Sequence, residues 1–174
     1  MDERKDFMFS RKDLQRLIIP LIVEQFLSIT IGMADTVMVS VCGEAAVSGV
    51  SLVDAINILM INIFSALATG GAIVSSQYIG REDLGKACEA AKQLVLAVFV
   101  LSTAIGAIFV FGGPQVLGLL YHDIEADVMA SAESYFFLTA LSYPFIALHN
   151  AGAALFRAMG NSKVSMTISI VMNC

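Results

Sequence analysis

Three acidic residues, Glu24, Asp35 and Asp54, lie within long apolar segments of the sequence. An ionisable side chain in hydrocarbon costs roughly 2.5 to 3.5 kcal/mol on insertion scales, so it usually faces a partner or a water-filled cavity. Glu24 and Asp35 are eleven residues apart. On a helix this places both on one face, at depths about 16 Å apart. The spacing predicts two carboxylates that line one pathway and bind protons or other cations. A carboxylate that pairs with another residue to hold helices together is the alternative, less favoured for Asp35 and equally supported for Glu24.

Asp54 begins a polar stripe along the second apolar segment. At 100° per residue, the other members lie no more than about 80° from it around the helix axis. They are Asn57, Asn62, Ser65, Thr69 and Ser76. The stripe either lines a solute cavity or forms hydrogen bonds between helices, next to small residues such as Ala66 and Gly70. Asp54 itself is expected within one turn of the outer helix end, where a solvated or capping carboxylate is the favoured interpretation.

The fourth apolar segment carries Tyr143, Pro144, His149 and Asn150. Pro144 has no N–H to donate to the carbonyl of Ala140, which predicts a bend and an available polar group in the middle of the membrane. Bends of this kind suit helices that move. Asn150 is a further candidate for the cavity lining, whereas a single His149 is more often an interior hydrogen-bonded residue than a proton carrier.

The composition requires that membrane-spanning elements position these residues. Apolar residues make up 57% of the 174 residues and charged residues 14%, and the mean hydropathy is +0.80. These values exclude a disordered chain, a nucleic-acid-binding protein and an ordinary soluble domain. The sequence contains no nucleophile and base pair, metal motif or glycine-rich phosphate loop. We therefore expect the lipid bilayer as a partner, and no enzymatic activity, cofactor or nucleic-acid partner.

Five apolar segments predict an all-α, polytopic transmembrane helix bundle. A cytoplasmic segment, 1–13, precedes a partial bundle over 14–174, with expected spans at 14–39, 51–79, 93–111, 132–156 and 164–174. The third span is expected to end at the Gly112-Gly113-Pro114 breaker. Eleven residues of a fifth helix rise only about 16 Å, half of the hydrocarbon thickness. We therefore expect four complete spans, a truncated fifth, and an N-terminal fragment whose partner is the missing C-terminal part of the same protein.

The basic residues predict the orientation of this bundle. All ten Lys and Arg precede or begin the first span, connect the second and third spans, or follow the fourth. These positions share one side of the expected topology, and basic loops remain in the cytoplasm. The sequence thus predicts a multi-pass protein of the plasma (inner) membrane with a cytoplasmic N-terminus.

Several stretches, in this order along the chain, resemble the MATE family of multidrug and toxin extrusion transporters. The first span and its following loop carry Ile19-Pro20, Gly32-Met33-Ala34-Asp35-Thr36-Val37-Met38-Val39 and Glu44-Ala45-Ala46-Val47-Ser48-Gly49-Val50-Ser51. Later matches are Ala68-Thr69-Gly70-Gly71, Ser76-Gln77-Tyr78-Ile79-Gly80-Arg81, Tyr143-Pro144-Phe145 and Arg157-Ala158-Met159-Gly160-Asn161. Ala34 stands where many relatives have Val, a mild departure next to the Asp35-Thr36 pair. The resemblance extends over nearly the whole chain.

The resemblance implies a cation-coupled exporter of twelve helices in two six-helix lobes, of which this chain holds about the first four and a half. It implies that Asp35 couples transport to a proton or sodium ion, with contributions from Tyr143 and Asn173. The implied substrate is a small organic, cationic solute, and no metal other than sodium is expected. A lipid or polysaccharide flippase of related architecture and a non-transporting membrane scaffold are the alternatives.

Overall fold

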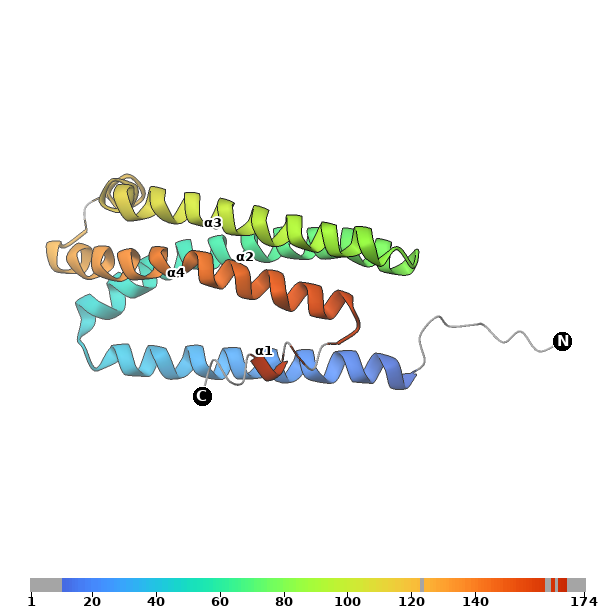
Figure 1. Cartoon of the computed structure of the whole chain (residues 1–174). Coiled ribbons are helices and arrows are strands. Elements are labelled where there is room, and N and C mark those ends of the chain that lie inside the picture. The colour runs from blue at the N-terminus through green and yellow to red at the C-terminus, as the bar shows by residue number, and fades with distance from the viewer. Residues whose placement is uncertain (1–10, 123, 162–163, 165, 169–174) are drawn as a thin grey trace.

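The computed structural model describes residues 11–122, 124–161, 164 and 166–168, and apart from short connections these residues are helical. The helices are α1 (Arg11–Ser40), α2 (Glu44–Gly80), α3 (Leu84–Leu120) and α4 (Ala126–Ala158). Successive helices run in opposite directions, so each connection lies at one end of the bundle (Figure 1). The expected all-α helix bundle is confirmed. Most of the expected fifth span lies outside the described residues.

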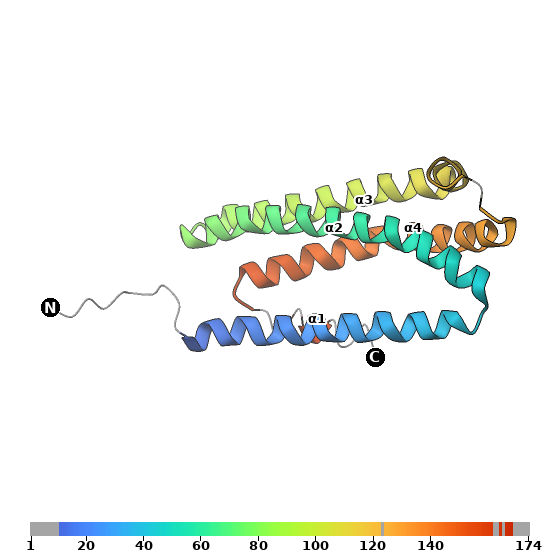
Figure 2. The ribbon, with the colours of Figure 1, turned by 180° about the vertical axis from the view of Figure 1, so that it is seen from behind.

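Three of the described helices have the length and hydropathy to cross a membrane, and their apolar segments are Ile18–Ser40, Glu44–Gly80 and Leu84–Leu120. The 33 residues of α4 are also long enough, at about 50 Å, but polar residues such as His149 and Asn150 dilute its apolar ones. α4 packs against both α2 and α3, and Figure 2 shows it between the α2–α3 pair and α1. A helix covered by its neighbours faces less lipid, which makes polar residues in it less costly.

The helices extend beyond the expected spans. α2 begins at Glu44 rather than at residue 51, and α3 begins at Leu84 rather than at residue 93. An apolar segment marks only the part of a helix that lies in hydrocarbon, about 30 Å, whereas the 37 residues of α2 or α3 rise about 55 Å. Asp83 caps α3 by accepting a hydrogen bond of 3.1 Å from the backbone N–H of Lys86. This bond and the nearby Lys86 side chain lower the pKa of Asp83.

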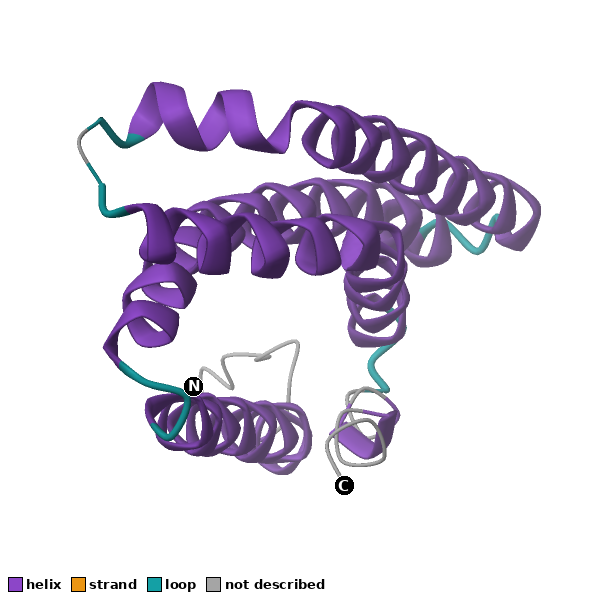
Figure 3. Cartoon of the chain, turned by 90° about the vertical axis from the view of Figure 1, so that its left-hand side faces the viewer, coloured by secondary structure: helices purple, strands orange, loops and turns teal. Residues whose placement is uncertain are grey.

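The expected end of a helix at Gly112-Gly113-Pro114 is wrong, because α3 continues through Pro114 to Leu120. A proline inside a helix removes one backbone hydrogen bond and bends the helix without necessarily ending it. Figure 3 shows the last turns of α3 running across the direction of the bundle. Leu117, in these turns, is fully buried in a cluster with Phe136. This burial stabilises the turns beyond the proline.

Small residues allow α4 to approach its neighbours closely. Its buried face carries alanines at Ala132, Ala140, Ala147, Ala151 and Ala154. On α3, a Cβ placed on Gly106 would lie 2.9 Å from the carbonyl oxygen of Ala140. This is the carbonyl to which Pro144 cannot donate a hydrogen bond. The proline in α4 and the glycine in α3 therefore occupy one helix crossing, where only a hydrogen atom fits between the backbones.

α1 is the least buried of the four helices. Large apolar side chains on it are left uncovered, including Phe26, which is 71% exposed, and Met33, which is 66% exposed. Near its middle, Glu24 lies 3.8 Å from the guanidinium of Arg157, at the end of α4. This ion pair links α1 to α4 away from the connection that joins α1 to α2.

We expect Gly106→Ala to destabilise the bundle by about 1 to 3 kcal/mol, because the added methyl group meets the Ala140 carbonyl. Thermal unfolding in detergent micelles measures this loss. Gly70→Ala is the matched control, since its Cβ would meet no atom within 4 Å other than its chain neighbours and the nearby backbone of its own helix. Equal melting temperatures for the two variants would contradict a tight α3–α4 crossing.

Candidate ion and solute cavity

A cavity of about 810 Å³ lies between α1, α2 and α4. On each helix the lining residues recur at intervals of three or four, so one face of each helix borders the cavity. The lining residues are Ser28, Gly32, Asp35, Thr36, Met38 and Val39 from α1; Val47, Val50, Ser51, Asp54, Asn57, Ile58 and Ile61 from α2; and Tyr135, Thr139, Ser142, Tyr143 and Ile146 from α4. The cavity thus combines residues that are far apart in the sequence.

Four of the candidate residues line this cavity together: Asp35, Asp54, Asn57 and Tyr143. Asp35 lies on α1, Asp54 and Asn57 lie on α2, and Tyr143 lies on α4. The sequence predicted cavity-lining residues for each helix separately. The structure adds which of these groups meet.

Asp54 accepts a hydrogen bond of 3.2 Å from the hydroxyl of Tyr135, through its Oδ1 atom. The expectation that Asp54 lies within one turn of the helix end as a capping acid is wrong, because α2 begins ten residues earlier, at Glu44. The interpretation of Asp54 as a solvated carboxylate stays a prediction, and its side chain is half-buried. The cap position is Gly43, which makes no side-chain capping bond. Asp54 therefore lies almost three turns inside the helix, about 15 Å from its start, and is paired with α4.

Tyr143 is the second link between α2 and α4. Its side chain is almost fully buried, and its hydroxyl donates a hydrogen bond of 2.9 Å to Oδ1 of Asn57. Its ring contacts those of Phe64 and Phe109, with centroids 5.8 Å and 6.0 Å away in edge-to-face geometry. Such pairs stabilise a fixed ring position. The aromatic cluster thus orients the hydroxyl that holds Asn57 at the cavity wall.

The remaining described candidates do not line this cavity. Glu24 pairs with Arg157, which is the helix-pairing alternative for that residue. Asn62 and Thr69 are exposed and Ser65 is half-buried. Ile61 is the last lining residue of α2, so Ser65 lies a turn deeper than the cavity although it shares the rotation of Asp54. A residue's angular position around the helix therefore does not by itself decide whether it lines the cavity. Its position along the helix axis matters as well.

Of the two remaining asparagine candidates, Asn150 lies outside the cavity lining and Asn173 outside the described residues. Asn150 lies one turn beyond Ile146, the last lining residue of α4, and its Nδ2 atom is buried without a hydrogen-bond partner among the described residues. Asn173 lies outside the described residues. Its expected part in coupling stays a prediction.

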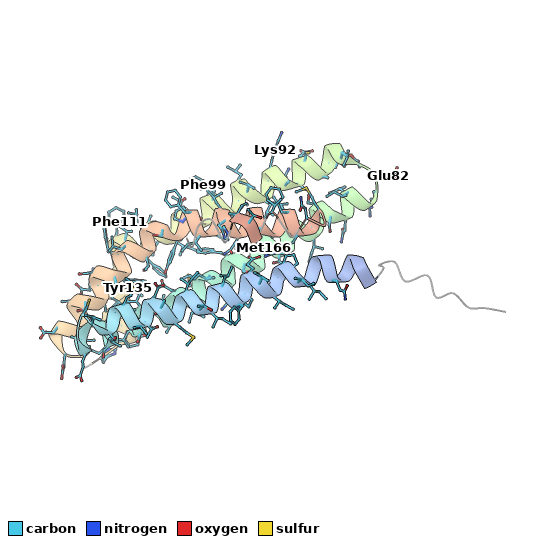
Figure 4. The ribbon with its side chains drawn as sticks, turned by 90° about the horizontal axis from the view of Figure 1, so that it is seen from below. Glu82, Lys92, Phe99, Phe111, Tyr135 and Met166 are labelled. Carbon is cyan, nitrogen blue, oxygen red and sulfur yellow. The ribbon has the colours of Figure 1, made fainter. Side chains whose placement is uncertain are left out.

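The sequence reasoning missed Tyr135, which holds Asp54. A signal was present: Tyr135 precedes Tyr143 by eight residues, a spacing that places both on one broad face of a helix. Figure 4 shows Tyr135 near the end of the bundle away from Glu82 and Lys92. The hydroxyl residues Thr36, Ser51 and Thr139 were also not predicted to line the cavity.

The chemistry of the lining favours positively charged ligands. It contains two carboxylates, and the lining residues that the structure describes include no Lys, Arg or His. Hydroxyl and amide oxygens supply further acceptors, while the walls are largely aliphatic. Carboxylate and neutral oxygen atoms bind protons or hard cations such as sodium, and aliphatic walls bind the apolar parts of an organic solute.

Comparison with known proteins identifies a family of transporters. The MatE family profile matches residues 20–173. The uncharacterized transporter YisQ from Bacillus subtilis (strain 168) is 30% identical over 155 residues, which cover 88% of this chain and 33% of that protein. The chain therefore spans about a third of the length of this curated relative. The resemblance to MATE transporters is confirmed.

Solved structures share the fold. A MOP superfamily transporter from Pyrococcus furiosus Vc1 (DSM3638), described as having a binding pocket of reverse polarity that suggests a different function, aligns with a TM-score of 0.86 over 93% of this chain and 35% of that chain. A MATE protein in complex with MaD3S aligns with a TM-score of 0.86 over 93% and 36%. Both are 18% identical to this chain, a likeness that concerns the fold alone. By its fold and by the family profile over residues 20–173, the chain belongs to the MatE family of multi-pass membrane transporters.

Proposed function

We propose that the protein is an antiporter that exports drugs or other organic solutes in exchange for protons or sodium ions. One observation carries the proposal: Asp35 lines a cavity of about 810 Å³ together with Asp54, Asn57 and Tyr143, and no basic residue is among the described lining. A cavity of this size can hold a small organic molecule. Its unbalanced negative charge favours a cationic solute or a coupling ion.

Exchange follows from competition at Asp35. If a proton or sodium ion occupies this carboxylate, a cationic solute loses its electrostatic partner and binds less tightly. The effect is reciprocal, because a bound solute must weaken ion binding by the same factor. Inward movement of the ion can then drive outward movement of the solute when the cavity opens alternately to the two sides.

Other residues of the same cavity lining support this role of Asp35. Asn57 presents its amide to the same cavity and is held by Tyr143 at 2.9 Å. Thr36 follows Asp35 in the lining, and its hydroxyl donates to the backbone carbonyl of Gly32 at 2.9 Å. These oxygen atoms are suitable additional ligands for sodium. Asn173 is proposed as a further contributor on the basis of the family resemblance.

The proposed membrane is the plasma (inner) membrane, with the N-terminus in the cytoplasm. Arg81, Lys86 and Arg157 belong to the ends of helices at the side where α1 begins (Figure 1), and Lys92 lies about 12 Å along α3 from the same side. The positive-inside rule assigns this side to the cytoplasm. The coupling ion would then move into the cell while the solute moves out, as the proposed exchange requires.

Asp35→Asn is expected to abolish ion-driven efflux, because the amide is nearly isosteric but cannot exchange a proton or pair with a cation. The protein, expressed from its natural gene in cells lacking other efflux pumps, is tested by accumulation of ethidium. Collapsing the proton gradient and the sodium gradient separately identifies the coupling ion.

Asp127→Asn is the matched control, since Asp127 is exposed in the first turn of α4 and does not line the cavity. It should keep wild-type efflux. Efflux by Asp35→Asn at the wild-type rate, with equal protein in the membrane, would refute the assignment of Asp35.

Tyr143→Phe is expected to change the ion dependence of efflux, because Asn57 loses the hydroxyl that fixes it at the cavity wall. The lost hydrogen bond should lower the free energy of unfolding by about 1 kcal/mol. Tyr121→Phe is the matched control: it removes a hydroxyl that donates to the Leu52 carbonyl at 3.0 Å, outside the cavity lining. Both variants should lose similar stability, and only Tyr143→Phe should raise the ion concentration needed for half-maximal efflux. The same shift in both variants would contradict a specific role of the Tyr143–Asn57 pair.

A further inference from the structure

We propose that Asp54 is a specificity-determining residue that makes the cavity prefer organic dications over monocations of the same shape. The inference rests on the proposed function, because it concerns which solute the same cavity binds. The proposed exchange at Asp35 does not require a second carboxylate, and the inference gives Asp54 a task of its own.

The two carboxylates enter the cavity from different helices. Asp35 lies on α1 and Asp54 on α2, and both line one cavity of about 810 Å³. Tyr135 donates its hydroxyl to Oδ1 of Asp54 at 3.2 Å. Because Tyr135 belongs to α4, this bond holds Asp54 against the α2–α4 wall, whereas Asp35 belongs to the less buried α1. The cavity therefore has two carboxylates on different helices, and a hydrogen bond from α4 holds one of them.

The surface around these groups suits an organic ligand. Ile58, Ile61 and Ile146 form part of the wall, and aliphatic walls favour an apolar or aromatic body. A bare divalent metal ion would instead need about six oxygen ligands around it, and Tyr135 already occupies one oxygen of Asp54. A flat apolar body with a cationic group at each end can satisfy both carboxylates and the walls.

Charge balance explains the preference. A monocation in this cavity, whose lining is largely apolar, leaves one carboxylate without a positive partner. An unpaired charge in such surroundings is unfavourable. A dication of the same shape pairs both groups, so the second charge should increase apparent affinity by at least about tenfold.

Methyl viologen and 1-methyl-4-phenylpyridinium test the inference, because they have nearly the same size and shape but carry two charges and one. Uptake of each labelled probe is measured in everted membrane vesicles from cells that express the protein from its natural gene. In the wild type, the half-saturating concentration should be at least about tenfold lower for methyl viologen. Asp54→Asn should remove most of this difference by weakening methyl viologen alone. Tyr135→Phe should reduce it less, and Asp54→Glu should retain it.

Each outcome decides between the two proposals. Equal half-saturating concentrations in the wild type overturn the dication preference, whether or not any variant folds. Equal weakening of both probes by Asp54→Asn also overturns it, because Asp54 would then serve transport in general. Asp127→Asn should leave both values unchanged. If wild-type vesicles take up neither probe and no other organic cation, the proposed export function itself fails. Transport of both probes without discrimination leaves that function intact and refutes only the role of Asp54.

Discussion

α4 lies against both α2 and α3 because small residues meet at each crossing. A Cβ on Gly106 of α3 would come within 2.9 Å of the Ala140 carbonyl, and one on Gly49 of α2 would come within 2.8 Å of the Ala132 nitrogen. In a bilayer, lipid chains are as apolar as the helices, so close van der Waals contact is a main source of association. The alanine face of α4 therefore determines where the two neighbouring helices can lie.

This packing also builds one wall of the cavity. With α2 and α4 held together, Tyr135 and Tyr143 reach across to Asp54 and Asn57. α1 completes the cavity and contributes Asp35, yet much of its surface is not covered by the described bundle. Among the described residues, the cavity thus has a closely packed wall from α2 and α4 and a second wall from the less buried α1.

Hydropathy predicted the helical class and the approximate positions of the helices well, because long apolar segments have few stable alternatives in a membrane. It predicted helix ends less well. Residues 44–50, which precede the expected apolar segment, belong to α2, and Pro114 bends α3 where an end was expected. The expected start of the second span at residue 51 was seven residues too late. The interpretation of Asp54 as a capping residue depended on that later start.

The sequence by itself determined the kinds of groups available: acids within apolar helices, basic residues confined to one side, and polar residues at helical spacing. It also determined the family, through motifs that occur in order along the chain. Only the tertiary structure decided that Asp35 and Asp54 share one cavity while Glu24 pairs with Arg157. The physical reason is that periodicity defines rotation and depth within a single helix. The offset and rotation between helices depend on contacts such as Gly106 against Ala140, which join residues distant in the sequence.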